Sequence, residues 1–200
     1  MSNRYEQTFQ GFLMFRNYRR GWAFPAEIDR LIQDETVALG KSTLHLYGGL
    51  ARFGTRMDID PATSPDILGN ALYPPFRCKS WDVVVVDPPY TSLPGSMVFQ
   101  IIGPAACLAR ERVWWVHTHW SVTSSLGLSL RRWWLGSPCS KGAPVRVIAE
   151  YSVTGHPGYC HAVPGRQRRK LRPEFTKYDW TKYVPTPARR GKYPTQGRLL

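Results

Sequence analysis

The chain has 200 residues, 42% of them hydrophobic, and a formal net charge of +13. That length and composition suit one domain with a sizeable core and exclude a fibrous or wholly disordered protein. No apolar run reaches the roughly 18–20 residues of a membrane-spanning helix, and no signal-peptide pattern begins the chain, so we expect no membrane partner.

A first helix is predicted over residues 25–39, after residues 1–24, which show no clear periodicity. Pro25 suits a first helical turn, and Gly40 suits a stop. Apolar and acidic side chains separate at helical spacing. The apolar face would hold Ile28, Leu31, Ile32 and Leu39, with Glu27, Asp29, Asp34 and Glu35 elsewhere.

Strands and helical stretches then alternate along the chain. Short strands are predicted over 42–47 and 55–59, and residues 61–80 are rich in proline and turn formers. Residues 83–86 are four valines without alternation, which is typical of a strand buried on both faces in a parallel sheet. The remaining predictions are a helix within 95–110 interrupted at Gly103-Pro104, a strand over 113–120, a helix over 123–135 and a strand over 145–153. The alternation predicts a layered α/β domain, with Trp114-Trp115 in its sheet and Trp133-Trp134 in a covering helix.

The tetrapeptide Asp87-Pro88-Pro89-Tyr90 directly follows the valine strand. Ligands of open parallel sheets bind beyond the carboxyl ends of the strands. Two prolines fix the backbone and remove two N–H donors, which leaves carbonyl acceptors. Asp87 adds an anionic acceptor and Tyr90 a flat ring, so the set suits a planar group with an exocyclic amine.

Residues 81–90 resemble the amino-group nucleic-acid methyltransferases that use S-adenosyl-L-methionine, whose hallmark is Asp-Pro-Pro-Tyr after a hydrophobic strand. Segments 44–49, 57–61 and 66–76 are similar, in order, to that family's glycine-bearing first strand, second-strand end and adenine-contacting segment. The resemblance implies a Rossmann-like class I methyltransferase sandwich of three α/β layers with a mostly parallel sheet. Only ten residues separate Leu46 from Met57, so its helices are abbreviated and the first cofactor helix is vestigial.

The resemblance also implies the cofactor contacts. Tyr47, Gly48 and Gly49 would let the backbone approach the methionine end of the cofactor, although a plain tight turn is the alternative. Asp58 would accept the ribose hydroxyls; Asp60 is the rival, and its other role would be to cap the next turn. Asn70, followed by Ala71, stands where the family usually has Asp and would accept from the adenine amine.

The target amine would be held by the tetrapeptide. Asp87 and the Pro88 carbonyl would accept its N–H groups, Pro89 would keep the turn rigid, and Tyr90 would stack on the extruded base. We therefore expect methylation of an exocyclic amine, with adenine N6 in DNA favoured and RNA or cytosine N4 as alternatives. A protein glutamine target is less expected, because those relatives usually begin the tetrapeptide with Asn. The rival from another class is a non-catalytic nucleic-acid-binding protein on a degenerate methyltransferase fold.

Residues 1–163 are predicted as the methyltransferase domain, with 1–24 as an extension, and 164–200 as a basic, proline-rich tail. The tail has 11 Lys or Arg residues and two acids, a net charge of +9. It is expected to be mostly extended and to bind a polyanion, with DNA favoured over RNA. The alternatives are a tail that only aids solubility, or one whose residues 178–183 add a strand to the sheet.

The four cysteines (Cys78, Cys107, Cys139 and Cys160) are scattered and predict reduced thiols in a cytoplasmic protein. Cys139, His156 and the pair Cys160-His161 could suggest zinc. The Cys-x-x-Cys spacing of structural zinc sites is missing, so no metal is expected. The sequence leaves the oligomeric state open.

Overall fold

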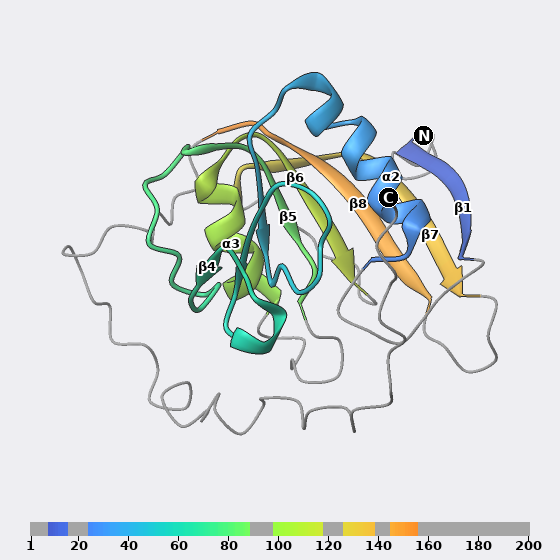
Figure 1. The fold of residues 1–200 in the computed structure, drawn as a ribbon. Helices are drawn as coiled ribbons and strands as arrows, with labels where there is room; N and C mark the ends of the chain where they lie inside the picture. The colour runs from blue at the N-terminus through green and yellow to red at the C-terminus, as the bar shows by residue number, and fades with distance from the viewer. Residues whose placement is uncertain (1–7, 16–23, 89–97, 118–125, 139–144, 156–200) are drawn as a thin grey trace, which may run out of the picture. The chain divides into compact units, whose positions relative to one another are not determined.

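A computed structural model describes residues 8–15, 24–88, 98–117, 126–138 and 145–155. These contain one sheet with the strand order β1-β7-β8-β6-β5-β2-β3-β4 (Figure 1). The strands are β1 (Phe9–Phe15), β2 (Thr43–Leu46), β3 (Thr55–Asp58), β4 (Ile67–Leu68), β5 (Trp81–Val86), β6 (Ala109–His117), β7 (Leu128–Pro138) and β8 (Arg146–Val153). Strand β8 is antiparallel to β6 and β7, and the other neighbours are parallel. The predicted mostly parallel Rossmann-like α/β sheet is confirmed; the division between domain and tail stays a prediction.

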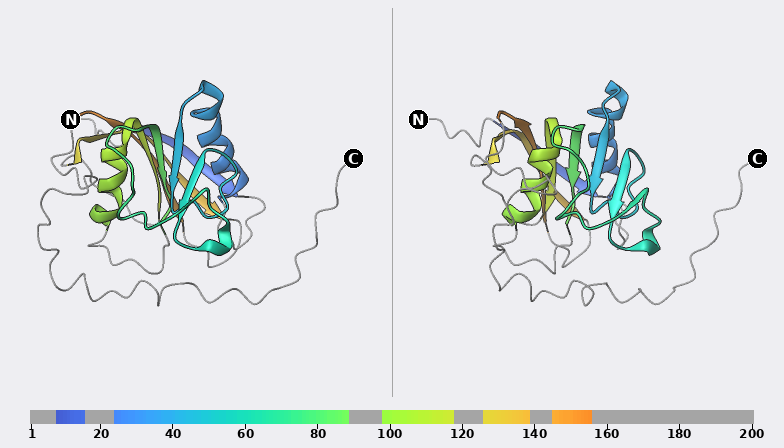
Figure 2. Two further views of the ribbon diagram at one scale, coloured as in Figure 1. Left: turned by 60° about the vertical axis from the view of Figure 1, so that its left-hand side comes forward. Right: turned by 90° about the vertical axis from the view of Figure 1, so that its left-hand side faces the viewer.

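The valine run lies at the centre of the sheet, as predicted. Each of the residues 83–86 in β5 is at most 1% exposed. Helix α2 (Ala26–Asp34) covers one face of the sheet and helix α3 (Val98–Leu108) covers the other (Figure 2). On the α2 face, Ile28 and Ile32 pack in a core cluster with Val83, Val85 and Trp114. Both faces of β5 are therefore shielded from solvent, because a helix covers each of them.

Helix α2 is shorter than the predicted 25–39. It ends at Asp34, and a separate 3-10 helix, η1 (Val37–Leu39), follows. The hydroxyl of Thr36 donates to the Ile32 carbonyl at 2.7 Å and takes up one of the carbonyls that the last turn leaves free. Gly40 then ends η1 at φ +68°, the left-handed stop that was predicted, and Leu39 is 57% exposed rather than part of the apolar face.

Helix α3 runs through Gly103 and Pro104, so the predicted interruption is wrong. Pro104 lacks the N–H that an interior helical residue donates. Apolar residues on both sides of it are completely buried, namely Ile101, Ile102, Ala105 and Ala106. Tertiary packing of these side chains outweighs the local helix-breaking tendency.

The helix predicted over 123–135 is a strand, β7, within its described part. Trp134 stacks on Trp114 with ring centroids 5.7 Å apart, whereas Trp133 contacts Phe9 of β1 at 4.5 Å. The two tryptophans therefore point to opposite faces, which is the period of a strand. Strand β1, in the stretch without periodicity, was not predicted at all; it pairs in parallel with β7 at the sheet edge.

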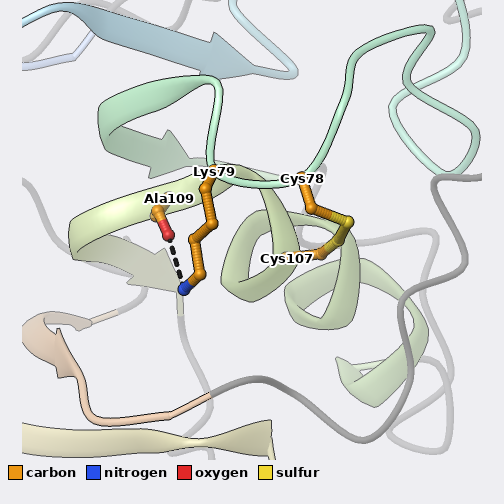
Figure 3. Close-up of a disulfide and its surroundings, with 4 residues drawn as sticks. All are labelled: Cys78, Lys79, Cys107 and Ala109. Carbon is orange, nitrogen blue, oxygen red and sulfur yellow. Dashed lines mark hydrogen bonds between the residues drawn. A yellow bond between two sulfur atoms is a disulfide. The ribbon is translucent and has the colours of Figure 1, made fainter.

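The expectation of reduced thiols is wrong for one pair of cysteines. Cys78, before β5, forms a disulfide with Cys107 of α3, with 5.1 Å between their Cα atoms (Figure 3). Lys79 strengthens the same junction, because its Nζ donates to the Ala109 carbonyl at 3.0 Å. The bridge fastens the segment before β5 to the helix after it. Cys139 and Cys160 lie outside the described residues.

Among the described residues, no helix has the length and hydrophobicity that a membrane span requires. In the same part of the chain, no three His, Cys, Asp or Glu side chains gather as metal ligands would. His156 and His161 lie outside it.

Candidate functional site

The chain reverses direction across the sheet between β2 and β5. From β2 it proceeds outward through β3 and β4, and from β5 it proceeds the other way through β6. Such a switch point opens a crevice beyond the carboxyl ends of the two central strands, where ligands of α/β sheets bind. Residues 47–49 leave β2 there and Asp87-Pro88 leave β5. The topology thus brings the predicted glycine loop and the predicted tetrapeptide to one edge.

Backbone hydrogen bonds join the strand ends in series. The Asp87 N–H donates to the Leu46 carbonyl at 3.5 Å, and the Gly48 N–H donates to the Met57 carbonyl at 2.9 Å. The Gly69 N–H then donates to the Asp58 carbonyl at 2.8 Å. The segments matched to the methyltransferases are therefore neighbours in space, in the order 87, 46–49, 57–58 and 69.

The turn after β2 replaces a helix. Residues 47–54 contain no helix, so the prediction of a vestigial first cofactor helix is confirmed. Tyr47 and Gly49 both have left-handed backbone, at φ +61° and +46°. Burial, with the neighbouring Asp58 charge, raises the pKa of the Tyr47 hydroxyl. Tyr47 is therefore a neutral phenol at physiological pH.

Gly48 has a packing requirement of its own. A Cβ built on it would lie 2.8 Å from the Cβ of Arg56 in β3, closer than real Cβ contacts. The glycine therefore lets the turn pass directly against β3. Whether it also admits a ligand to the backbone stays a prediction.

Gly48→Ala should lower the free energy of unfolding by about 1–3 kcal/mol, because β3 or the turn must move to admit the methyl group. Urea denaturation measures this loss. Gly103→Ala is the matched control: a Cβ there meets nothing within 4 Å, and alanine favours its helix. Equal stability of the Gly48 variant and the wild type would contradict the close packing.

Asp58 ends β3 and holds the turn through both carboxylate oxygens. Oδ2 accepts from the Gly49 N–H at 2.8 Å and Oδ1 accepts from the Asp60 N–H at 2.9 Å. Each carboxylate oxygen can accept a second hydrogen bond. The carboxylate therefore shapes the turn and can still accept a hydroxyl ligand at this edge.

Asp60, the rival of Asp58, has the capping role that was its alternative. Its Oδ1 accepts from the Ala62 N–H at 2.9 Å and caps the 3-10 helix η2 (Pro61–Thr63). This contact confirms the local role of Asp60 and favours Asp58 as the acid available to a ligand.

Asn70 stands two residues beyond β4. Its Oδ1 accepts from the Leu72 N–H at 2.9 Å, and its carbonyl accepts from the Tyr73 N–H at 2.9 Å. The side chain therefore shapes a turn, which buries the neighbouring Ala71 at 3% exposure. One acceptor position and the NH₂ group of Asn70 remain for a ligand.

The tetrapeptide is described only in its first half. Asp87 is half-buried and Pro88 is buried at the end of β5. Pro89 and Tyr90 lie outside the described residues, so their predicted parts stay predictions.

Sequence reasoning missed Asp29, which was expected away from the buried face of α2. It is only 4% exposed, and neither carboxylate oxygen has a hydrogen-bond partner among the described residues. Arg52 Nε approaches Oδ2 at 3.6 Å. Burial raises the pKa of Asp29 to about 6, against the opposing effect of Arg52. Its position three residues before the buried Ile32 was the signal available in the sequence.

Comparisons with known proteins support the fold. No protein-family profile matches the sequence, and no curated protein matches it. A candidate RNA methyltransferase from Pyrococcus horikoshii superimposes with a TM-score of 0.50 at 13% identity, over 72% of this chain and 93% of that one. Magnesium protoporphyrin IX methyltransferase from Synechocystis, solved with bound SAM, gives 0.48 at 12% identity, over 63% and 78%. The chain therefore has a Rossmann-like α/β fold of the methyltransferase type.

Proposed function

We propose that this protein transfers a methyl group from S-adenosyl-L-methionine to an exocyclic amino group of a nucleic-acid base. One observation carries the proposal: the glycine turn, the Asp58 carboxylate and Asp87-Pro88 meet at the switch point of a methyltransferase-type sheet. The glycine turn and Asp58 belong to the segments that resemble the family's cofactor motifs. Asp87-Pro88 belongs to the segment that resembles its target motif.

The residues at this edge fit the cofactor in chemical type. Asp58 offers free acceptor positions for ribose hydroxyls, and Asn70 offers one for the adenine amine. The Tyr47–Gly49 turn lies beside Asp87, where the methionine end would come next to the target. When bound, the cofactor supplies an electrophilic methyl group on its sulfonium.

Asp87 and Pro88 would position the amine. Pro88 has no N–H, so the backbone here presents acceptors, and the Asp87 carboxylate adds an anionic one. Methyl transfer to the amine would place developing positive charge on its nitrogen. A fixed carboxylate beside it stabilises that charge, and this is the main catalytic contribution expected from the protein.

The target we favour is adenine N6 in DNA. An amine inside a duplex is not accessible, so the base must be extruded, and Tyr90 is proposed as its stacking surface. RNA and cytosine N4 are the alternatives, and the Pyrococcus horikoshii protein is named for RNA.

Methyl transfer from radiolabelled S-adenosyl-L-methionine to separate pools of DNA, RNA and protein tests the function. Nucleoside analysis of the labelled pool identifies the base and the sugar together. We expect label in N6-methyldeoxyadenosine. A protein that shows neither transfer nor a thermal shift with the cofactor would instead support a non-catalytic nucleic-acid-binding protein.

The basic tail is proposed to bind the phosphate backbone. Truncation at Pro164 removes a net charge of +9 and should weaken DNA binding and flatten its salt dependence. About 0.9 units of log–log slope are lost for each phosphate contact removed. Binding titrations at several salt concentrations measure the slope. An unchanged slope in a folded truncation would contradict this role, and loss of cofactor binding would favour the alternative in which the tail adds a strand.

A further inference from the structure

Asp29 lies on the part of α2 closest to the candidate site. The carboxyl-terminal flank of the helix fixes its direction, because Glu35 pairs with Arg112 in the first half of β6. Helix α2 therefore runs against the parallel strands, and its first turn, which contains Asp29, lies towards their carboxyl ends (Figure 1).

Arg52 approaches Asp29 from the glycine turn. The Ala51 N–H donates to the Gly48 carbonyl at 2.9 Å, so the chain folds back on the turn just before Arg52. The Arg52 side chain is 66% exposed, and its Nε is 3.6 Å from Asp29, too far for a hydrogen bond. The two opposite charges are thus adjacent but loosely engaged, between α2 and the turn.

A buried carboxylate without hydrogen bonds is costly to a folded protein. Native structures rarely keep such a group unless a ligand, ion or water satisfies it. Asp29 has acceptor positions on both oxygens, and the exposed guanidinium of Arg52 has donors to spare. An acceptor and a donor of opposite charge, side by side, match an amino-acid zwitterion.

We propose that Asp29 and Arg52 bind the amino-acid end of S-adenosyl-L-methionine. The Asp29 carboxylate accepts from the α-ammonium group, and the Arg52 guanidinium donates to the α-carboxylate. This assignment rests on the proposed function, which places the methionine end of the cofactor at the same glycine turn.

Two ligands that differ only in this end test the proposal. S-adenosylhomocysteine carries the amino-acid end, whereas 5′-methylthioadenosine has the same adenosine and thioether without it. Asp29→Asn and Arg52→Gln should each weaken S-adenosylhomocysteine by about 10- to 100-fold in calorimetry, the range for a lost charge-assisted hydrogen bond. Binding of 5′-methylthioadenosine should stay within about twofold, because this ligand lacks the groups that the Asp29 carboxylate and the Arg52 guanidinium are proposed to contact.

Asp34→Asn and Arg30→Gln are matched controls on the same helix, at exposed positions, and should change neither affinity. If the wild type binds S-adenosylhomocysteine and both site variants bind it equally well, this assignment is overturned while the proposed function stands. If the wild type binds neither ligand, both the assignment of Asp29 and Arg52 and the proposed function are contradicted.

The ligand-free protein gives a second readout. Burial raises the pKa of Asp29 from 3.8 to about 6, so the folded state holds its proton more tightly than the unfolded state does. The contribution of Asp29 to stability is therefore lost as pH rises through this window. Arg52 is the charged group that faces it.

Asp29→Asn should therefore melt at a higher temperature than the wild type at pH 8, and the difference should disappear towards pH 4. In the same range, the affinity of the wild type for S-adenosylhomocysteine should fall below about pH 6, whereas that of Asp29→Asn should not. A variant that melts lower than the wild type at pH 8 would assign Asp29 a structural role and overturn the proposal.

Discussion

Asp87→Ala is expected to lower the rate of methyl transfer by about 10²- to 10³-fold, the usual cost of removing one group that stabilises transition-state charge. Asp87 follows β5 directly and its N–H bonds to Leu46 at the end of β2, so its position depends on the two central strands. The affinity for S-adenosylhomocysteine should stay within a few-fold, because Asp87 is proposed to face the target amine. Radiolabel transfer measures the rate, and calorimetry measures the affinity.

Asp82→Asn is the matched control, because Asp82 is an aspartate at the opposite end of the same strand. It accepts from the Ser42 hydroxyl at 2.7 Å and from Arg110 at 2.9 Å. Hydrogen bonds from Ser42 and Arg110 lower the pKa of Asp82 to about 2. The control should lose stability but keep its transfer rate per folded molecule. An Asp87→Ala protein that transfers methyl groups at nearly the wild-type rate would remove Asp87 from the mechanism.

The centre of the fold was predictable because a strand that is buried on both faces has consecutive apolar residues. Residues 83–86 are apolar on both sides of the chain, a pattern that is typical of a strand covered on both faces. The strands over 43–46 and 55–58 were bounded by glycines and an Asp-Pro turn, which are local signals. The strand order, and with it the topological switch point, comes from the structure.

The right-hand half of the sheet in Figure 1 was less predictable, because its strands are specified by distant partners. Leu126, Leu130, Trp133 and Trp134 recur at helical spacing, yet residues 128–138 form β7 between β8 and β1. Trp134 stacks on Trp114 and Trp133 contacts Phe9, and these contacts with other strands favour a strand over a helix here. None of these partners is visible in a local window.

At the candidate site, residue types were predictable and hydrogen-bond geometry was not. The resemblance favoured Asp58 over its rival Asp60, although both acids lie near the same strand end. The structure separates them, since Asp60 caps η2 while Asp58 faces the glycine turn. Asp29 was missed because a charged residue in a helix is normally solvated, and its burial depends on how α2 packs.

A buried ion cluster, distant from the site, carries the largest predicted effect on stability. Glu150 of β8 is completely buried, and Arg132 Nε contacts its Oε2 at 2.6 Å. Arg131 and Arg112 approach its Oε1 at 3.2 and 3.3 Å. The register shift in β7 between Leu130 and Arg132 allows two consecutive arginines to reach the same carboxylate.

Glu35, after α2, completes the cluster. The side-chain hydrogen bond between Arg132 and Glu35 is the main cause of two pKa shifts. It lowers the pKa of the Glu35 carboxyl and raises the pKa of the Arg132 guanidinium. The cluster therefore fastens α2 to β6 and β7 across the sheet face. Because Glu35 meets Arg112 in the first half of β6, this contact lies away from the strand ends that form the site.

Glu150→Gln should lower the free energy of unfolding by about 3 kcal/mol, the low end of the range for breaking a buried ion pair, because it removes the fully buried acid of the cluster and leaves Glu35 as the acid that Arg112 and Arg132 still contact. Urea denaturation measures the loss. Glu111→Gln is the control, since its pair with Lys41 is largely exposed and should contribute about 1 kcal/mol or less. The affinity for S-adenosylhomocysteine of the folded Glu150 variant should match the wild type, because the cluster does not touch the glycine turn. A loss below 1 kcal/mol would mean that the arginines find other partners, and a change in affinity at full folding would mean that α2 transmits the loss to Asp29.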